Sequence, residues 1–128
     1  DPQVNNASRL IFCSGRVYYD LIAEREKLQE TSTAIVRVEL LYPLPAAEMA
    51  AIAAKHPNAN LLWVQDEPAN QGPWSFIALR TAEQFGGVGF DGRALRRVSR
   101  RATASPATGN HHLHEDEQKA LMQEAFTR

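Results

Sequence analysis

The sequence predicts an α/β fold of three layers, in which a mostly parallel sheet carries helices on both faces. Two observations lead to this prediction. Short apolar runs alternate with segments of helical periodicity, in the order β-α-β-α-β-α-β-loop-α. The strands also read as continuous apolar runs and not as alternating ones, which is typical of parallel strands buried on both faces.

The first half of the chain contains two strand–helix units. Residues 9–13 are a short apolar strand, and residues 16–29 carry apolar side chains at helical spacing. Residues 34–38, Ala-Ile-Val-Arg-Val, are rich in β-branched residues and predict the second strand. Pro45 suits the first turn of a helix, because proline fixes φ and lacks an N–H that would be unpaired there. That helix is expected to run to about residue 55.

The second half repeats the alternation. Residues 61–65 are an apolar strand, and the helix that follows is expected to start within residues 70–73 and to end near residue 85. A fourth strand is expected at residues 94–99, and an amphipathic helix at residues 114–126. The two expected loops are residues 86–89, which contain three glycines, and residues 100–110, which are rich in small residues.

The length of 128 residues fits one domain, and the hydrophobic fraction of 44% is enough for a core. We expect a flexible lead-in at residues 1–8 and a single domain at residues 9–128. The chain begins with Asp1 and not with Met, so we expect it to be a fragment of a longer protein.

The composition argues against several classes of partner. The net charge of -1 argues against a general polyanion binder, and we expect no nucleic-acid partner. No apolar run approaches the roughly 18 residues that span a membrane, so we expect no membrane partner. The single cysteine, Cys13, lies in an apolar run and is expected to be a buried thiol in a reducing compartment.

Ligands of open α/β sheets bind beyond the carboxyl ends of the strands, where the stretch from Asp66 to Trp74 is expected to lie. It begins with two acids, Asp66 and Glu67. Neighbouring side chains in a strand point to opposite faces, so these two acids do not make a close catalytic pair. We expect one of them to cap the next helix or to pair with an arginine, with an interface or ligand role as the alternative.

Five arginines fall within nine positions of the fourth strand and its end. Strand alternation places Arg96 and Arg100 on one face, and Arg97 and Arg101 on the other. This is not a one-sided nucleic-acid stripe, and no aromatic stacking residue accompanies it. The arrangement suits ion pairs with a neighbouring surface, or a phosphate group held by two hydrogen bonds.

No catalytic constellation is evident. The Ser14-Gly15 turn lacks the glycine pattern of a nucleotide-binding loop, and no serine has the spacing of an activated nucleophile. His111, His112 and His114 lack partners at metal-ligand spacing and are expected to be exposed at the start of a helix. We therefore predict no catalytic, cofactor or metal residue in this chain.

Several segments together resemble the C-terminal domain of the first component of 2-oxoglutarate dehydrogenase, which depends on thiamine diphosphate. The resemblance runs from residue 9 to residue 126, and the order and spacing of the segments make it specific. The segments that carry it are FCSGRVYYDL at 12–21, IVRVELLYPLP at 35–45, WVQDEPANQGPW at 63–74 and SRRATASPATG at 99–109, followed by His114-Glu115.

The resemblance implies a fold like the C-terminal domain of transketolase. It also implies that the full-length enzyme decarboxylates 2-oxoglutarate with thiamine diphosphate and Mg²⁺, bound outside this domain, and succinylates a lipoyl group. The implied partners are the upstream domains of the same chain, a second copy in a homodimer, and the lipoyl-bearing succinyltransferase component. We expect a bacterial, cytoplasmic protein.

Supporting the homodimer is the expected role of this domain, which is not expected to be catalytic alone. One alternative is a regulatory module that binds acetyl-CoA or a nucleotide, and another is the equivalent domain of a pyruvate or branched-chain 2-oxo acid dehydrogenase. The candidate interface or ligand contacts are Glu67, Gln71, Arg96 and Arg100.

Overall fold

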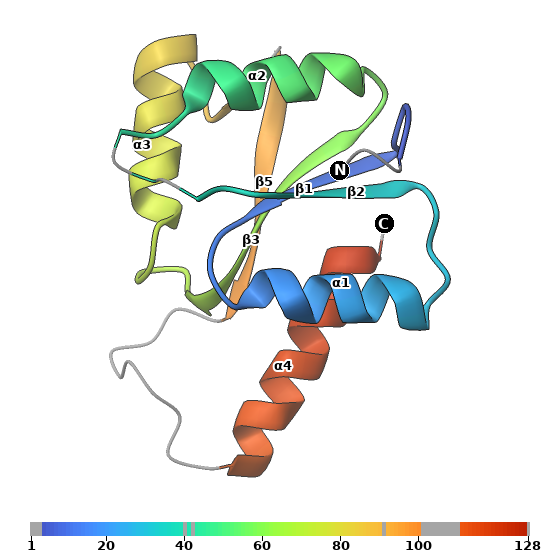
Figure 1. Cartoon of the computed structure of the whole chain (residues 1–128). Helices are drawn as coiled ribbons and strands as arrows, with labels where there is room; N and C mark the ends of the chain where they lie inside the picture. The colour runs from blue at the N-terminus through green and yellow to red at the C-terminus, as the bar shows by residue number, and fades with distance from the viewer. Residues whose placement is uncertain (1–3, 40, 42, 91, 101–110, 128) are drawn as a thin grey trace.

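A computed structural model describes residues 4–39, 41, 43–90, 92–100 and 111–127, with the backbone alone at 111–114 (Figure 1). The strands are β1 (Arg9–Cys13), β2 (Thr33–Arg37), β3 (Asn60–Pro68), β4 (Gly89–Phe90) and β5 (Arg93–Arg100). The helices are α1 (Val17–Lys27), α2 (Ala46–Lys55), α3 (Trp74–Phe85) and α4 (His111–Phe126). The strands form one sheet in the order β2-β1-β3-β5-β4.

Four of the five strands are parallel, and β4 alone runs antiparallel, at the edge beside β5. β1 lies between β2 and β3, so its residues are covered by a strand on each side. The central position and the helices on both faces together bury all five residues of β1. The mostly parallel sheet predicted from the continuous apolar runs is confirmed.

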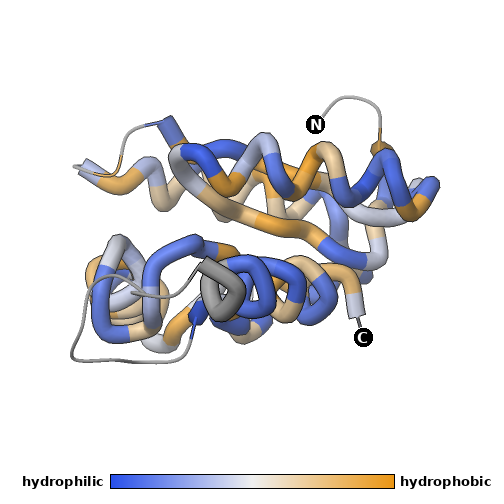
Figure 2. Tube along the Cα trace, turned by 90° about the horizontal axis from the view of Figure 1, so that it is seen from below, coloured by the Kyte–Doolittle hydropathy of each residue, from blue (hydrophilic) through white to orange (hydrophobic). Residues whose placement is uncertain are grey.

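The helices cover the sheet on both faces, as predicted. Residues of α2 and α3, among them Met49 and Ile77, pack into one hydrophobic cluster, and residues of α1 and α4, among them Leu21 and Leu121, pack into the other. In Figure 2 the helices alternate between hydrophilic and hydrophobic residues along their turns, as expected for helices with one buried face.

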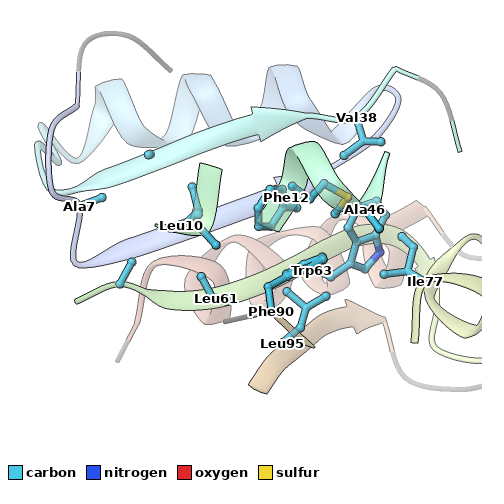
Figure 3. Close-up of a cluster of buried hydrophobic side chains, with 14 residues drawn as sticks. Ala7, Leu10, Phe12, Val38, Ala46, Leu61, Trp63, Ile77, Phe90 and Leu95 are labelled. Carbon is cyan, nitrogen blue, oxygen red and sulfur yellow. The ribbon is translucent and has the colours of Figure 1, made fainter. Parts of the chain in front are cut away.

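The strands divide their side chains between the two clusters by simple alternation. In β1, Leu10 and Phe12 face the α2/α3 side, whereas Ile11 and Cys13 face the α1/α4 side. Figure 3 shows the first cluster, in which Phe12 lies near Trp63 and Phe90. A shift of one residue in strand register would move every side chain of the strand to the other cluster.

The structure differs from the expectation at β4, because residues 86–89 were expected to be loop only. Gly89 has φ of 142°, and a Cβ there would overlap the carbonyl oxygen of Arg93. The backbone of Gly89 therefore approaches β5 more closely than any other residue would allow, and it pairs with Ala94. Glycines next to one another suggested a loop, and the close approach makes one of them a strand residue.

Two element boundaries differ from the prediction by three residues, and several others differ less. β3 continues to Pro68, past the predicted end at residue 65, with an irregular register against β5 between Val64 and Pro68. α4 begins at His111, three residues before the predicted start. The side chains at 111–114 lie outside the described residues, as do Arg101 and most of the predicted loop at 100–110.

The amino-terminal edge of the sheet is fastened by Arg93 and His56. The Arg93 guanidinium donates to the carbonyl oxygens of Ala53, His56 and Ala59 at 2.6 to 2.8 Å. The Ala53 carbonyl lies in the last turn of α2, and those of His56 and Ala59 lie in the segment that leads from α2 into β3, so Arg93 joins β5 to both. His56 Nδ1 accepts a hydrogen bond from the backbone N–H of Ala7 at 2.9 Å, so this part of the lead-in is packed against the domain.

Candidate functional site

The carboxyl ends of β1, β2, β3 and β5 meet at one edge of the sheet. The chain leaves β1 toward β2 and leaves β3 toward β5, so the order of connections reverses between β1 and β3. In open α/β sheets such a reversal is where ligand sites form. The stretch from Asp66 to Trp74 lies at this position and runs from the last three residues of β3 to the first residue of α3.

The buried side chain of Gln65 holds this stretch in place through hydrogen bonds to its main chain. It is 1% exposed, and its Oε1 accepts hydrogen bonds from the indole N–H of Trp63 at 3.0 Å and the backbone N–H of Trp74 at 2.9 Å. Its Nε2 donates to the carbonyl oxygens of Pro68 and Gln71, both at 2.8 Å, and of Glu67 at 3.2 Å. The opposite amide orientation would face oxygen toward oxygen, so the network fixes it.

The Gln65 network gives a rigid corner, which we define as residues 66–74. Trp74 is the first residue of α3, and its N–H is one of the helix donors that lack a partner within the helix. No side chain caps α3 at Pro73, so Gln65 supplies that acceptor from the neighbouring strand. One buried amide thus sets both the shape of the corner and the start of the helix.

Glu67 and Gln71 lie on this corner. Glu67 is exposed, and its side chain lies over Gly72, where an added Cβ would fall 2.9 Å from the Glu67 Cδ. Gly72 has φ of 69°, which favours glycine on its own account. Gln71 is half-buried, and its backbone carbonyl is held by Gln65. Glu67 is therefore the carboxylate that the corner presents to solvent.

Arg100 lies beneath the same edge and is engaged within the chain. Its side chain is 8% exposed. Its Nε donates to the carbonyl oxygen of Asp66 at 2.7 Å, and its Nη2 lies 3.3 Å from the Asp66 carboxylate. It also donates to Glu117 and Gln118 of α4, each at 2.7 Å. The predicted pairing of an acid of this stretch with an arginine is confirmed for Asp66.

The contacts of Arg100 extend through Gln118 to α1, the neighbouring helix on the same face of the sheet. The Gln118 amide accepts from Arg100 and donates to the Asp20 carboxylate of α1 at 3.0 Å. β3, β5, α4 and α1 are therefore joined through one guanidinium and one amide. The burial of Arg100 is matched by hydrogen bonds to charged and neutral acceptors, as a buried charge requires.

Arg96 lies apart from these residues. It shares the α4 face with Arg100, as the alternation predicted, and its Nη1 lies 3.7 Å from the Glu124 carboxylate. Arg96 also lines a hollow of about 420 Å³ with Arg9 and Arg93, at the amino-terminal edge of the sheet. The structure thus brings Glu67, Gln71 and Arg100 to one edge and leaves Arg96 nearer the other.

A second polar group stands at the ends of β1 and β2. The Arg37 guanidinium lies 5.5 Å from the ring centre of Tyr18 and 5.2 Å from that of Tyr19, and it donates to the Tyr19 hydroxyl at 3.0 Å. The hydrogen bond to the Tyr19 hydroxyl raises the pKa of Arg37, and the nearby Glu39 carboxylate raises it further by a smaller amount. Tyr19 is 60% exposed, so this group faces solvent.

The described residues hold no assembled catalytic group. Cys13 is fully buried, and burial raises the pKa of its thiol to about 12, with Arg37 acting in the other direction. Such a thiol is a poor nucleophile. Three or more His, Cys, Asp or Glu side chains do not converge anywhere in the described part of the chain. The side chains of His111, His112 and His114 lie outside the described residues.

Sequence reasoning missed Gln65 and Arg93, and the signal for each was weak. Gln65 ends an apolar run and precedes two acids, so it reads as the first exposed residue after a strand. A polar amide two residues after a tryptophan on the same strand face was the available sign, since a buried indole N–H needs an acceptor. Arg93 was counted only as part of the arginine cluster.

The fold and the corner at residues 66–74 define the class of domain. It is a three-layer, mostly parallel α/β domain with an ordered corner at the carboxyl edge of its sheet. No helix within the described ranges has the length and apolar character needed to cross a membrane. The family model for the 2-oxoglutarate dehydrogenase C-terminal domain matches residues 1–126, and the chain belongs to this family.

Individual relatives agree with the family match. The 2-oxoglutarate dehydrogenase E1 component of Cupriavidus necator is 43% identical over 132 residues, covering 100% of this chain and 14% of the relative. The mitochondrial 2-oxoglutarate dehydrogenase of Caenorhabditis briggsae is 40% identical, covering 94% and 12%. The E1/E2 component of Corynebacterium glutamicum is 42% identical, covering 98% and 10%.

These comparisons favour the E1 C-terminal domain over the alternatives of a regulatory ligand-binding module and of a pyruvate or branched-chain dehydrogenase. The chain corresponds to a C-terminal portion of E1 enzymes and spans between 10% and 14% of the length of these three relatives.

Proposed function

We propose that this domain supports homodimer assembly of a 2-oxoglutarate dehydrogenase E1 component, which decarboxylates 2-oxoglutarate and passes the succinyl group to a lipoyl group. The domain itself supplies no catalytic residue. Thiamine diphosphate and Mg²⁺ are held by other parts of the enzyme. The full-length enzyme is an oxidoreductase of the tricarboxylic acid cycle and acts in the bacterial cytoplasm. The lipoyl group belongs to the succinyltransferase component, its partner.

One observation carries the proposed assembly role: the corner at residues 66–74 is fixed from within, yet presents its own carboxylate outward. A surface that is rigid before binding loses little conformational entropy when a partner covers it. Gln65 provides the rigidity through its contacts to Trp74 and to three carbonyl oxygens. Glu67 is the exposed group on that surface, so we assign the contact to it, with Gln71 beside it.

The test uses the full-length enzyme that carries this domain, with Glu67→Lys as the variant. We expect a shift from dimer to monomer in sedimentation analysis and a loss of decarboxylation in proportion to the lost dimer. Glu83→Lys is the matched control, because Glu83 is also exposed and lies on α3 away from the corner. The substitution makes the same change of charge as Glu67→Lys. A Glu67→Lys enzyme that stays dimeric would count against the interface role.

A separate measurement tests whether the domain acts alone. The 128-residue chain is incubated with 2-oxoglutarate, thiamine diphosphate and Mg²⁺, and released carbon dioxide is measured. We expect no turnover, because the described residues include no activated nucleophile and Cys13 is buried with a raised pKa. Turnover by the purified chain would overturn the assignment of catalysis to other domains.

A further inference from the structure

The outer edge of β5 is paired over only part of its length. On one side β5 lies beside β3 (Figure 1) and pairs with it at residues 95–98 and at Arg100. On the other side it pairs with β4 at Arg93 and Ala94 alone. β4 has only two residues. Among the described residues, no strand lies beyond the second half of β5.

The direction of each backbone group in β5 follows from two hydrogen bonds. The Leu95 N–H donates to the Val88 carbonyl on the β4 side, and the Arg100 carbonyl accepts from Ala69 on the β3 side. Successive residues of a strand turn their N–H and C=O groups to opposite sides. The N–H and C=O groups of Arg97 and Ser99 therefore point to the same side as those of Leu95, away from β3. They lie beyond the end of β4.

Charge surrounds this edge. Arg97 is exposed, and among the described residues it forms no ion pair, while Arg96 beside it is 49% exposed and only loosely paired with Glu124. Charged side chains on an edge strand discourage pairing between like edges. They also favour an incoming strand of opposite charge, since oppositely charged cross-strand pairs stabilise a sheet.

A second copy of this chain is a poor occupant for the same reason. In an antiparallel pairing, placing Arg97 opposite Arg97 of the other copy brings two guanidinium groups together. Moving the pairing to place Arg97 opposite Ser99 brings Arg96 opposite Arg100 instead. Each of these registers sets like charges directly across from one another, which is destabilising.

We propose that the outer edge of β5 at Arg97 and Ser99 adds one extended strand from a partner segment that carries a carboxylate opposite Arg97. Two alternate residues of that segment exchange backbone hydrogen bonds with Arg97 and Ser99, and the carboxylate pairs with the Arg97 guanidinium. This is recognition by strand addition, with affinity from the backbone and selectivity from the charge.

The experiment follows the amide signals of the 128-residue chain by two-dimensional ¹H–¹⁵N NMR during titration with a synthetic peptide of alternating Glu and Thr. We expect the Arg97 and Ser99 signals to move and their hydrogen exchange to slow. The Arg96 and Val98 amides, which face β3, stay protected throughout. A peptide with Lys in place of Glu, and one N-methylated at every Thr, are both expected to bind at least about tenfold more weakly.

Variants of the chain test the same edge from the other side. Ser99→Pro removes an outward N–H without touching the β3 ladder, and Ser99→Ala separates this loss from the loss of the hydroxyl. Arg97→Glu reverses the charge and keeps the backbone, so it remains informative if Ser99→Pro fails to fold. Arg80→Glu is the matched control on α3, where the guanidinium is similarly exposed.

We expect Ser99→Pro and Arg97→Glu to weaken peptide binding about tenfold, with Ser99→Ala and Arg80→Glu close to wild type. Three results would overturn the proposal. These are absence of binding, signal changes confined to other parts of the chain, and equal binding of the N-methylated peptide. Self-association lost in Arg97→Glu would identify a second copy as the occupant and would also overturn it.

Discussion

Oε1 of Gln65 accepts a hydrogen bond from the backbone N–H of Trp74 at 2.9 Å, which joins a fully buried residue of β3 to the first residue of α3. The same side chain holds three carbonyl oxygens of the intervening corner. The start of α3 and the conformation of residues 66–74 therefore depend on one amide.

Replacing Gln65 by leucine is expected to lower the free energy of unfolding by about 2 to 4 kcal/mol, because the Trp63 indole N–H and the corner carbonyls lose their partner while buried. Chemical denaturation monitored by tryptophan fluorescence measures the change. Gln84→Leu, the same substitution at an exposed position of α3, is the control. Equal stabilities for the two variants would contradict the role given to Gln65.

Arg100→Lys is expected to cost about 1 to 3 kcal/mol, since an ammonium group cannot reproduce the fork that reaches Asp66, Glu117 and Gln118 together. The conservative Arg97→Lys change at an exposed position of the same strand is expected to stay within about 0.5 kcal/mol of wild type. Thermal unfolding of both variants compares them directly. A tolerated Arg100→Lys would show that α4 is held by its apolar contacts alone.

His56 is expected to make the domain less stable in mild acid. Burial, followed by nearby positive charge that includes Arg93, lowers the pKa of His56 below its ordinary value. The unfolded chain therefore binds a proton before the folded one does as the pH falls below about 6.5. The stability is fully present above that pH and is lost progressively as the pH drops toward the lower, folded-state pKa.

His56→Asn isolates this effect, because the Asn side-chain oxygen can replace Nδ1 as the acceptor for Ala7 without titrating. Unfolding curves for wild type and variant between pH 5 and pH 8 are subtracted, which cancels the chain's other three histidines. We expect the difference to grow toward acid. A difference that does not change with pH would sink the assignment.

The thiol of Cys13 is expected to be unreactive in the folded protein at pH 8, since it is buried and burial raises its pKa to about 12. Reaction with a thiol-specific reagent should appear only as denaturant unfolds the chain, so its rate reports global opening. Fast labelling of the native protein would mean that β1 is exposed by a local movement.

Gly89→Ala is expected to be destabilising by more than about 2 kcal/mol, because the new methyl group meets the Arg93 carbonyl and the φ of 142° disfavours any side chain. Gly87→Ala, two residues earlier in open space, is expected to change stability by less than about 0.5 kcal/mol. The comparison measures the close approach of β4 to β5, and equal effects would contradict it.

The layers and strand directions were predictable because they rest on continuous apolar runs, such as Leu10 to Cys13 and Leu61 to Val64, that alternate with segments of helical spacing. The pairing of Asp66 with an arginine was predictable as a class, and the alternation of Arg96 and Arg100 onto one face was predictable from strand geometry. These features depend on neighbours in sequence or on a fixed period.

Gln65, Arg93 and Gly89 were beyond sequence reasoning for a common physical reason. The acceptor held by Gln65 at Trp74 and the carbonyls held by Arg93 at the end of α2 become neighbours only once the sheet has formed. The backbone approach at Gly89 likewise exists only between two strands already in place. A local pattern carries no record of such partners, so each residue resembled an ordinary loop or surface position.

The corner after β3 has an evolutionary consequence. Gln65 bonds to main-chain atoms of the corner, so apart from Gly72 the path of the corner depends little on which side chains it displays. A substitution at the exposed Glu67 would therefore change the proposed contact surface while the path of the main chain stays the same. Selection could then alter the proposed contact without altering the fold that carries it.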